Sequence, residues 1–424
     1  MLIKGARAVD PANKRDEISD IRIKDGVIAE TGRNLKAEPE EEIIDASGLT
    51  AAPGFIDGHC HFRDPGFEYK EDILTGAAAA AKGGFTSVIC LANTNPPVDN
   101  VDTLSYVLEK GRKTGINVYS AACISKGMNG EELTDLDSLK KAGAAVFTDD
   151  GKPLADAALT EKAMKWAAEN GAVLSFHEED PHLVGTAGVN DGKVSRALGF
   201  TKGAEASAED CLVARDCAIA VRTGARICIQ HISSGVSAEF VRHAKSMGAD
   251  VWAEATPHHF SMTEDDVLKH GTLAKMNPPL RTEEDRRAII EAIADGTIEV
   301  IATDHAPHSE EEKAREFAKA PSGIIGLETS FAAGYTYLVK PGHLTLSKLI
   351  ERMTAGPARL YSLNAGTLSE GAPADIVLID TEEKWLVTDD FASKSKNSPY
   401  IGETLTGKVK MTICGGKVVY DETR

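Results

Sequence analysis

The sequence predicts an α/β fold, a (β/α)8 barrel of the TIM type with a small β-sandwich domain formed by both chain termini. Two observations indicate it. In the middle of the chain, short apolar runs alternate with helical stretches, whereas both ends have the pattern of short strands joined by tight turns. Neither end can bury an apolar face alone, so we expect residues 1–50 and 368–424 to form one small β domain. Residues 51–367 are then the inserted barrel.

The two ends of the chain carry hairpin signals. Asp20–Lys24 alternates polar and apolar residues, Asp25-Gly26 favours a tight turn, and Val27–Ala29 begins the return strand. At the other end Gly415-Gly416 favours a second turn. The strands expected there are Ala374–Asp380, Lys408–Ile413 and Lys417–Tyr420.

Eight apolar runs in the middle of the chain have the length of buried strands. They are Ala51–Ile56, Phe85–Leu91, Ile116–Cys123, Ala144–Thr148, Ala172–Phe176, Arg226–Gln230, Val251–Ala255 and Ile298–Ala302. The helical segments between them include Glu71–Ala81, Glu161–Glu169, Ala208–Arg222 and Glu283–Ala294. Eight strands alternating with helices predict a parallel barrel.

The overall charge limits the classes of partner. The formal net charge of −18 disfavours nucleic acid and anionic membranes as partners. It does not exclude an anionic small substrate, because a local cluster of Arg, His and metal can reverse the sign within a cleft.

The cysteines and the chain start predict a cytoplasmic protein. The seven cysteines are scattered without a CxxC pair, as expected for small buried residues in a reducing compartment. The start of the chain lacks a signal-peptide core, and no stretch of 18 apolar residues occurs.

Metal-binding side chains follow several of the predicted strands. His59 and His61 come after the first, and because strand side chains alternate faces these two point the same way. The candidates after later strands are Asp149, Asp150, His177, His231 and Asp304. Active sites of such barrels form at the carboxyl ends of the strands, so we expect these side chains to converge.

The candidate set indicates hydrolytic chemistry. It comprises four histidines and two aspartates, one of them either Asp149 or Asp150. Imidazole and carboxylate suit Zn²⁺, and six ligands suit two ions that share a carboxylate better than one. Two ions can activate a water and polarise a carbonyl oxygen together.

Several motifs resemble those of the amidohydrolase superfamily, and within it dihydroorotases of the longer bacterial type. The matching stretches are GFIDGHCHFRDPG (54–66), ANTNP (92–96), FTDDG (147–151), NPPLR (277–281), ATDHAPH (302–308), GIIGLET (323–329) and KNSPYIG (396–402). They span most of the barrel in the expected order. The His-x-His pair occurs throughout the superfamily, whereas its combination with Arg63, Asn93 and the DHAPH segment is specific.

The resemblance implies two Zn²⁺ per subunit. Their ligands would be His59, His61 and Asp304 for one ion and His177 and His231 for the other. Asp150 and a hydroxide would bridge the two ions, with Asp149 as the alternative carboxylate. Many relatives use a carboxylated lysine here, but this segment has no lysine before Lys152, which disfavours hydantoinases and allantoinases.

The resemblance also implies the substrate contacts. Arg63 offers a planar fork that matches a carboxylate, which dihydroorotate carries and neutral hydantoins lack. The other implied contacts are His61, Asn93, Asn277, His308, Ser322 and Gly323. Two alternatives stay open: Arg63 could pair with Asp64 at the surface, and Asn93 could merely shape the turn before Pro96.

Three further segments have weaker interpretations. Glu178 and Glu179 could orient a ligand histidine or be solvated. His258-His259 favour packing or a supporting role behind the ligands. The charged run Ser309–Lys319 is expected to be an exposed helical stretch, part of which could act as a lid.

The implied activity is reversible zinc-dependent hydrolysis of (S)-dihydroorotate to N-carbamoyl-L-aspartate in de novo pyrimidine (UMP) biosynthesis, with Asp304 as the catalytic acid and base. One alternative is another cyclic amidase, namely a hydantoinase, dihydropyrimidinase or allantoinase. The other is a low-activity homologue that acts as an assembly subunit with aspartate transcarbamoylase. The expected partners are the small substrate, a second copy in a homodimer and, as a further candidate, aspartate transcarbamoylase, with neither nucleic acid nor membrane.

Overall fold

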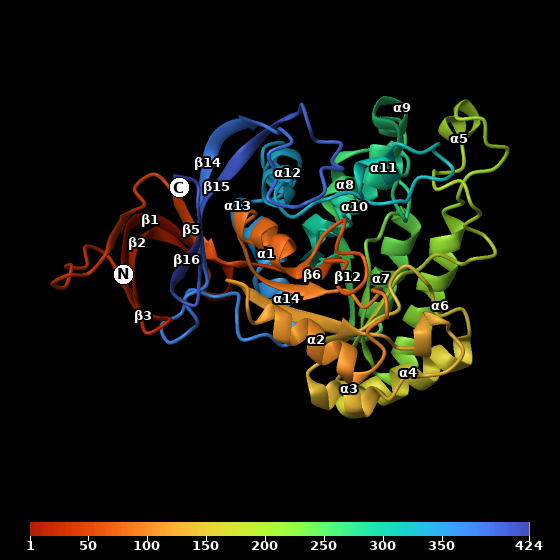
Figure 1. Ribbon diagram of the computed structural model, residues 1–424, viewed down its shortest axis with the longest axis horizontal. Helices are drawn as coiled ribbons and strands as arrows, with labels where there is room; N and C mark the ends of the chain where they lie inside the picture. Colours follow the sequence, from red (N-terminus) through yellow and green to blue (C-terminus); the bar gives the residue numbers. More distant parts are fainter. Residues whose placement is uncertain (424) are drawn as a thin grey trace.

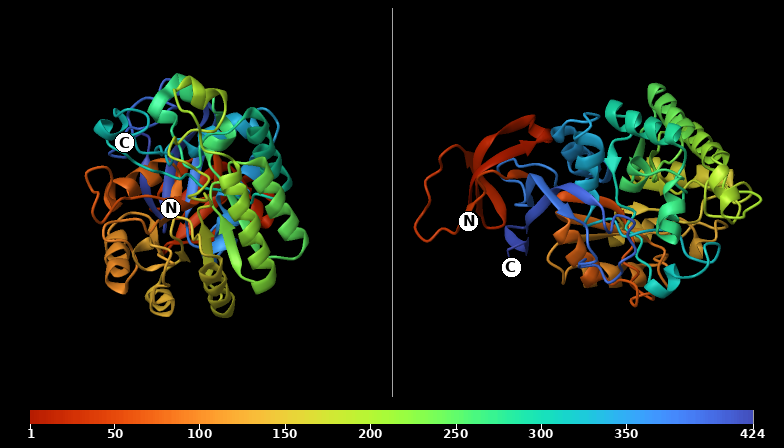
Figure 2. Two further views of the ribbon diagram at one scale, coloured as in Figure 1. Left: turned by 90° about the vertical axis from the view of Figure 1, so that its right-hand side faces the viewer. Right: turned by 90° about the horizontal axis from the view of Figure 1, so that it is seen from above.

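The computed structural model describes residues 1–423 and contains two eight-stranded sheets (Figure 1). One is a parallel barrel with strand order β13-β12-β11-β10-β9-β8-β7-β6, and the other combines strands from both ends of the chain. The two termini lie on the same side of the molecule, at the terminal sheet (Figure 2). The predicted fold class is therefore confirmed.

The barrel strands are short, and their residues toward the carboxyl ends are buried, as expected for apolar runs in a parallel sheet. Their bounds are β6 (Phe55–Cys60), β7 (Phe85–Cys90), β8 (Asn117–Ala122), β9 (Val146–Phe147), β10 (Val173–Phe176), β11 (Arg226–Ile229), β12 (Val251–Ala255) and β13 (Val300–Ile301). The chain after β13 returns to the end of β6, where the His61 amide donates to the His305 carbonyl at 2.8 Å and closes the barrel.

The terminal sheet has the order β16-β15-β14-β5-β1-β2-β3, with β4 paired to β1. Its strands are β1 (Leu2–Asp10), β2 (Arg15–Lys24), β3 (Val27–Gly32), β4 (Ile43–Asp45), β5 (Thr50–Pro53), β14 (Ile376–Leu386), β15 (Thr404–Cys414) and β16 (Lys417–Asp421). Lys24 pairs with Val27, and Cys414 pairs with Lys417, so both hairpin turns lie where the sequence predicts them.

The first predicted barrel strand, 51–56, is wrong. This run is not a single strand, because β5 belongs to the terminal sheet and β6 to the barrel. Gly54 separates them, and a Cβ at this position would lie 2.2 Å from the Thr86 hydroxyl oxygen. The absence of a side chain lets the chain pass between the sheets. As a result β6 extends to Cys60 and includes His59.

The helices mostly cover the outside of the barrel. They are α1 (Ile73–Lys82), α2 (Val101–Gly111), α3 (Leu136–Ala142), α4 (Ala157–Asn170), α5 (Lys193–Ala197), α6 (Ser207–Thr223), α7 (Gly235–Ser246), α8 (Pro257–Ser261), α9 (Asp266–His270), α10 (Glu283–Asp295), α11 (Glu310–Lys313), α12 (Ser330–Gly334), α13 (Leu346–Met353) and α14 (Ala355–Tyr361). Short turns are η1 (Pro11–Asn13), η2 (Lys126–Met128), η3 (Gly271–Ala274) and the π-helical η4 (Tyr335–Val339). Within residues 1–423, none of the helices combines the length and apolar character that a membrane crossing requires.

The charged run 309–319 differs from its predicted form. Only α11, four residues long, is helical, and the Lys313 side chain is buried. Lys313 and Lys275 donate hydrogen bonds to backbone carbonyls of residues 317–323, which therefore have partners without a helix. This segment crosses the carboxyl end of the barrel, where the candidate site lies.

Candidate metal centre

The predicted metal ligands converge at the carboxyl end of the barrel. His59 is the penultimate residue of β6, His177 directly follows β10, and His231 comes two residues after β11. Asp150 and Asp304 follow β9 and β13 on short loops. All are buried, and two overlapping groups have ligand atoms within 4.8 Å of one another: His59, His61 and Asp150, and Asp150, His177 and His231.

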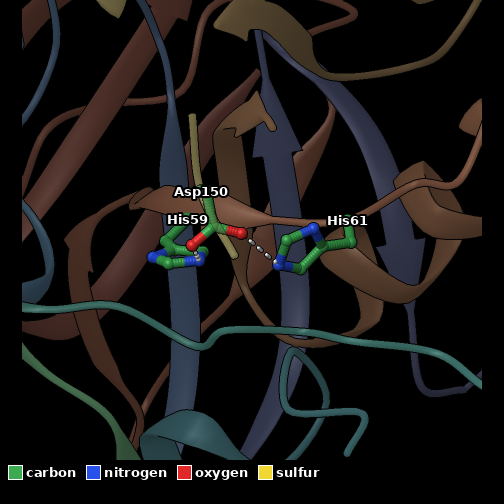
Figure 3. A group of neighbouring side chains, drawn as sticks. All are labelled: His59, His61 and Asp150. Atoms are coloured by element: carbon green, nitrogen blue, oxygen red, sulfur yellow. Dashed lines mark ion pairs between the residues drawn. The ribbon is translucent and has the colours of Figure 1, made fainter. Parts of the chain in front are cut away.

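Asp150 lies at the centre of the cluster. Figure 3 shows its carboxylate between two imidazole rings, with Oδ1 3.4 Å from His59 Nε2 and Oδ2 3.4 Å from His61 Nε2. Its Oδ1 is also 3.6 Å from His177 Nδ1 and 3.7 Å from His231 Nε2. Burial alone would raise the pKa of Asp150, but the charge of His59 and the nearby rings of His177 and His231 hold it well below its ordinary value. This carboxylate can therefore face both groups at once.

The neighbouring Asp149 has a different environment. Its carboxylate accepts hydrogen bonds from the Ile124 amide at 2.8 Å and from the Ser125 amide at 3.1 Å, and also binds the Ser125 hydroxyl. These bonds fix the loop after β8. The geometry thus favours Asp150 over Asp149 as the shared ligand.

Asp304 faces the first histidine pair. Its Oδ1 is 3.1 Å from His61 Nε2 and 3.5 Å from His59 Nε2. Burial would raise the pKa of Asp304, but hydrogen bonding to His61 and the charge of His59 lower it far below the ordinary value. The side chain is therefore ionised and is positioned to bind a cation or accept a proton.

The structure adds a buried carboxylate that the sequence patterns did not single out. Glu254 on β12 is completely buried, and its Oε1 lies 2.5 Å from His59 Nδ1 and accepts from the His231 amide at 3.2 Å. A carboxylate on one ring nitrogen leaves the other free to bind metal. The only local signal was a charged residue within an apolar strand.

Glu178 and Glu179 are both buried, so the solvated alternative is wrong. Glu179 Oε2 lies 2.9 Å from His177 Nε2 and orients that ring toward Asp150. Glu178 instead faces the carboxylate of Asp216 and the charge of Arg215. Of the two, the residue that touches a ligand is Glu179.

The donor atoms fit a divalent cation. His61 Nδ1 donates to Asn93 Oδ1 at 2.9 Å, which leaves Nε2, 3.1 Å from Asp304 Oδ1, as the ring nitrogen that a cation can bind. His59 Nε2 is buried and makes no hydrogen bond within the described chain. Burial would lower the pKa of His59, yet the charges of Glu254 and Asp150 raise it well above normal. Such a cluster attracts positive charge, and a metal can supply it.

Three residues of the site have unusual backbone conformations. Arg63, His231 and Asp304 have φ angles of 61°, 30° and 44°. Non-glycine residues rarely adopt positive φ, and each such position costs on the order of 1–3 kcal/mol. Such strained conformations persist where the surrounding fold holds the residue in place. The strain therefore indicates that the side chains of these three residues are held in fixed directions.

The predicted substrate contacts line one cavity of about 230 Å³ beside the ligands. The lining residues are His61, Arg63, Asn93, Asp150, Gly151, His177, His231, Asn277, Asp304, Ala306, His308, Ser322 and Gly323. A second cavity of about 520 Å³ shares Gly151, His177, Asn277 and Ser322 with it. The ligand cluster therefore faces a small chamber that continues into a wider one.

Arg63 lines this chamber rather than pairing with Asp64. Its Nε donates to the Pro307 carbonyl at 3.3 Å, whereas Asp64 pairs with Lys110. Burial lowers the pKa of Arg63, although Asp304 and Asp150 counteract this effect. The surface-pair alternative is therefore wrong.

The amides of the chamber are held by neighbours. Asn93 Oδ1 accepts from His61, and its Nδ2 donates to Asp150 Oδ2 at 3.2 Å, so it holds two ligands in addition to lining the cavity. Asn277 Oδ1 accepts from the Ser322 hydroxyl at 3.0 Å. Asn93 therefore does more than shape a turn.

The chain is similar to known proteins in both sequence and structure. A family model described as "Dihydro-orotase-like" matches residues 48–237, and one described as "Amidohydrolase family" matches residues 318–420. A dihydroorotase of Clostridioides difficile is 59% identical over 99% of this chain and 100% of its own length. One from Clostridium acetobutylicum is 52% identical over 100% of both chains.

Solved structures share the architecture at lower identity. The L-hydantoinase (dihydropyrimidinase) of Arthrobacter aurescens has a TM-score of 0.90 at 25% identity, covering 99% of this chain and 96% of that one. The dihydropyrimidinase of Brevibacillus agri has a TM-score of 0.88 at 22% identity, covering 100% of this chain and 95% of that one. These matches concern the fold.

Proposed function

The chain belongs to the dihydroorotase family of the amidohydrolase superfamily, and we propose that the six ligands at the barrel mouth hold a two-metal centre. The enzyme hydrolyses a cyclic amide, dihydroorotate, reversibly to N-carbamoyl-aspartate in pyrimidine biosynthesis. The observation that carries the site assignment is the single carboxylate of Asp150 within 3.7 Å of four histidines.

We assign two Zn²⁺ ions to this centre. His59, His61 and Asp304 would hold one ion and His177 and His231 the other, with Asp150 within reach of both groups. Nitrogen and oxygen donors of this kind suit zinc. When bound, two such ions lower the pKa of a water and polarise the ring carbonyl.

The chamber residues orient the substrate. Arg63 is the buried cation of the cavity, and its guanidinium can form paired hydrogen bonds with the substrate carboxylate. Asn277, His308 and the Ser322–Gly323 backbone line the same cavity. A ring held at its carboxylate presents its amide carbonyl to the ligand cluster, which lowers the entropic cost of the reaction.

Asp304 carries the proton. It accepts the proton of the attacking water as the new C–O bond forms, and returns it to the ring nitrogen as the C–N bond breaks. Its low pKa keeps it ionised before the reaction, and its position beside His61 places it at the reacting end of the chamber. In the reverse direction the same carboxylate accepts the proton of the attacking carbamoyl nitrogen as the C–N bond forms, and returns it to the departing hydroxide, which leaves as water.

The test is an assay of dihydroorotate hydrolysis and N-carbamoyl-aspartate cyclisation by the purified protein, with metal analysis. We expect both directions to proceed and about two zinc ions per chain. A panel of hydantoin, dihydrouracil and allantoin probes the other cyclic amidases. Turnover of these neutral rings in preference to dihydroorotate would contradict the assignment, and so would activity that is indifferent to zinc removal.

Arg63→Ala tests the carboxylate contact separately. We expect a rise in KM for dihydroorotate of roughly 10²-fold, since a charge-assisted pair to a buried group is lost. Arg63→Lys keeps the positive charge but loses the planar pair of donors, so its KM should lie between those of wild type and Arg63→Ala. An unchanged KM in Arg63→Ala would remove this residue from the site.

We assign the enzyme to the cytoplasm, in keeping with its seven unpaired cysteines, and to a homodimer. Helix α7 has an exposed apolar stripe of Val236, Phe240 and Met247 that extends just past its end, which a second copy could cover. Sedimentation of the pure protein, alone and with aspartate transcarbamoylase, distinguishes monomer, dimer and mixed assembly.

A further inference from the structure

A mostly buried ion pair lies beside His308. Lys70 Nζ is 2.8 Å from Glu312 Oε1, and their side chains are 11% and 13% exposed. Glu312 Oε1 also accepts from the Tyr69 hydroxyl at 2.9 Å, and its Oε2 accepts from the Ser309 amide at 3.0 Å. Both oxygens of this carboxylate are therefore occupied, which fixes its position.

The ammonium of this pair contacts the imidazole. Lys70 Nζ lies 3.4 Å from His308 Nδ1, on the side away from the chamber. On the other side, His308 Nε2 is 2.8 Å from the carbonyl oxygen of Ser322, a chamber residue. The Glu312 carboxylate also lies near Nδ1, but its Oε2 is farther away, at 3.6 Å, and already binds the Ser309 amide, so Lys70 is the nearer neighbour of this nitrogen.

These two neighbours determine where the proton sits. A carbonyl oxygen can only accept, so His308 Nε2 must carry a hydrogen. An ammonium can only donate, so Nδ1 must be bare. Burial, together with the charges of Arg63, Lys70 and Lys313, lowers the pKa of His308 to about 2 even though Glu312 opposes this effect. His308 is accordingly a neutral ring with its N–H on the chamber side.

We propose that Lys70, held by Glu312, is a positioning residue that fixes the proton of His308 on Nε2 and so presents an uncharged donor to the substrate carboxylate. The proposal rests on the proposed function of the chamber. The substrate then shares this N–H with the Ser322 carbonyl, while Arg63 provides the positive charge.

The arrangement has a physical advantage. The opposite tautomer would turn the Nε2 lone pair toward both the Ser322 carbonyl and the substrate carboxylate, and all three would repel. A protonated His308 would add a second buried cation beside Arg63, which is costly without a partner. Lys70 disfavours both states from outside the chamber.

The pair also joins two segments. Lys70 lies on the loop between β6 and α1, and Glu312 lies on α11 in the segment that crosses the barrel mouth. A substitution at either end should therefore change the same property of His308. If substitutions of Lys70 and of Glu312 both change the protonation of His308, the pair positions that proton. A purely structural role would change stability without this common effect.

The experiment uses metal-loaded protein labelled with ¹⁵N in its histidine rings. Long-range ¹⁵N–¹H spectra distinguish Nε2–H, Nδ1–H and protonated rings, and the spectrum of His308→Gln assigns the signals. We expect wild type to show the Nε2–H form of His308. In Lys70→Met, the Glu312 carboxylate, 3.6 Å from Nδ1, is left without its ammonium, so we expect an Nδ1–H or protonated ring.

Kinetics provide the second readout. Lys70→Met should raise KM for dihydroorotate about tenfold with kcat within about twofold, since a binding contact rather than the chemistry is affected. Lys70→Arg, which retains a donor-only cation, should restore the wild-type tautomer and most of the KM. Glu312→Gln keeps an oxygen for the Ser309 cap and should still shift His308. Glu311→Gln, at an exposed position on the same helix, is the matched control and should change nothing.

The spectra and the kinetics distinguish failure of the Lys70 proposal from failure of the proposed function. An Nδ1–H or protonated His308 in the wild-type protein overturns the proposal whether or not the variants fold. A Lys70→Met protein with a wild-type spectrum and unchanged KM overturns it as well. Wild-type protein that binds zinc but does not turn over dihydroorotate contradicts the proposed function instead, and the spectra then still report on Lys70.

Discussion

Asp304 is the residue on which the proposed chemistry depends most directly. It is ionised, buried and 3.1 Å from His61 Nε2. Asp304→Asn removes the proton acceptor while keeping an oxygen for the metal. We expect kcat to fall by about 10²–10⁴-fold, as for loss of a general acid–base. Steady-state kinetics with metal analysis measure this.

Asp265→Asn is the control, since this carboxylate lies at the surface and pairs only with Lys193 among the described contacts. It should leave kcat unchanged. Near-normal turnover by metal-loaded Asp304→Asn would remove the proton-transfer role from this residue.

Glu254 provides the second residue-scale prediction. It holds His59 Nδ1 and the His231 amide, so Glu254→Gln removes the charge that keeps the His59 ring oriented. We expect metal affinity to fall by about 10–100-fold, with activity restored at high zinc. Zinc titration of the apoprotein measures this.

Glu299→Gln is the matched control for Glu254. Glu299 is largely buried just before β13 and pairs with Lys245, away from the ligand cluster. It should leave zinc affinity unchanged even if stability falls. Equal zinc affinity in wild type and Glu254→Gln would show that His59 needs no such partner.

At the scale of elements, the segment from α11 to Gly323 is held by two lysines. Lys313 Nζ donates to the Pro321 and Gly323 carbonyls at 2.9 and 3.0 Å, and Lys275 Nζ donates to the Phe317 and Ala320 carbonyls at 2.7 and 2.8 Å. Because Ser322 and Gly323 line the chamber, these bonds fix part of its wall.

The buried amine makes this wall sensitive to pH. Burial and the charge of Lys275 lower the pKa of Lys313 from 10.5 to about 7. The unfolded chain therefore binds more protons between these pH values, and stability rises with pH across this window. Relative to Lys313→Met, wild type should gain roughly 2–4 kcal/mol of unfolding free energy from pH 7 to 10.

Tm measurements of both proteins across this window are the check. Lys319→Met, which removes an exposed lysine of the same segment, should keep the wild-type slope. If wild type and Lys313→Met showed parallel Tm curves, Lys313 would retain an ordinary pKa in the folded protein.

At the scale of the whole molecule, the ligands come from five different barrel strands, so a metal links most of the circumference. A ligand bound only by the folded state stabilises it by about 2.7 kcal/mol at a hundredfold excess over its Kd. Chelation should therefore lower Tm by several degrees and abolish activity, and zinc should restore both.

The control for metal removal is Asp150→Asn, which should be less stable and respond weakly to chelator. Scanning calorimetry before and after dialysis against chelator measures both proteins. An unchanged Tm and full activity in metal-free wild type would contradict the two-metal centre.

The terminal sheet is part of the same structural unit as the barrel. Val377 and Ile379 on β14 belong to the main apolar core together with Phe55 on β6, and the Gly54 amide donates to the Asp375 carbonyl at 2.8 Å. The division of the chain at residues 51 and 367 stays a prediction, and β5 at Thr50–Pro53 already lies in the terminal sheet.

The sequence by itself determined the barrel and the approximate position of the site. Alternation of apolar runs with helical stretches is a local property, and so is the occurrence of His59, His177 or Asp304 where such a run ends. Parallel strands place these ends at one face, so local patterns were sufficient to predict that the candidates converge.

Only the tertiary structure decided what each side chain contacts. Asp149 and Asp150 are adjacent, and their roles differ because the Ile124–Ser125 loop binds the first and leaves the second to the histidines. In the sequence Glu254 is an isolated charge within an apolar strand, whereas in the fold it contacts His59, which is 195 residues away along the chain. The hydrogen-bond partners of these buried polar groups come from distant segments of the chain, so only the tertiary structure identifies them.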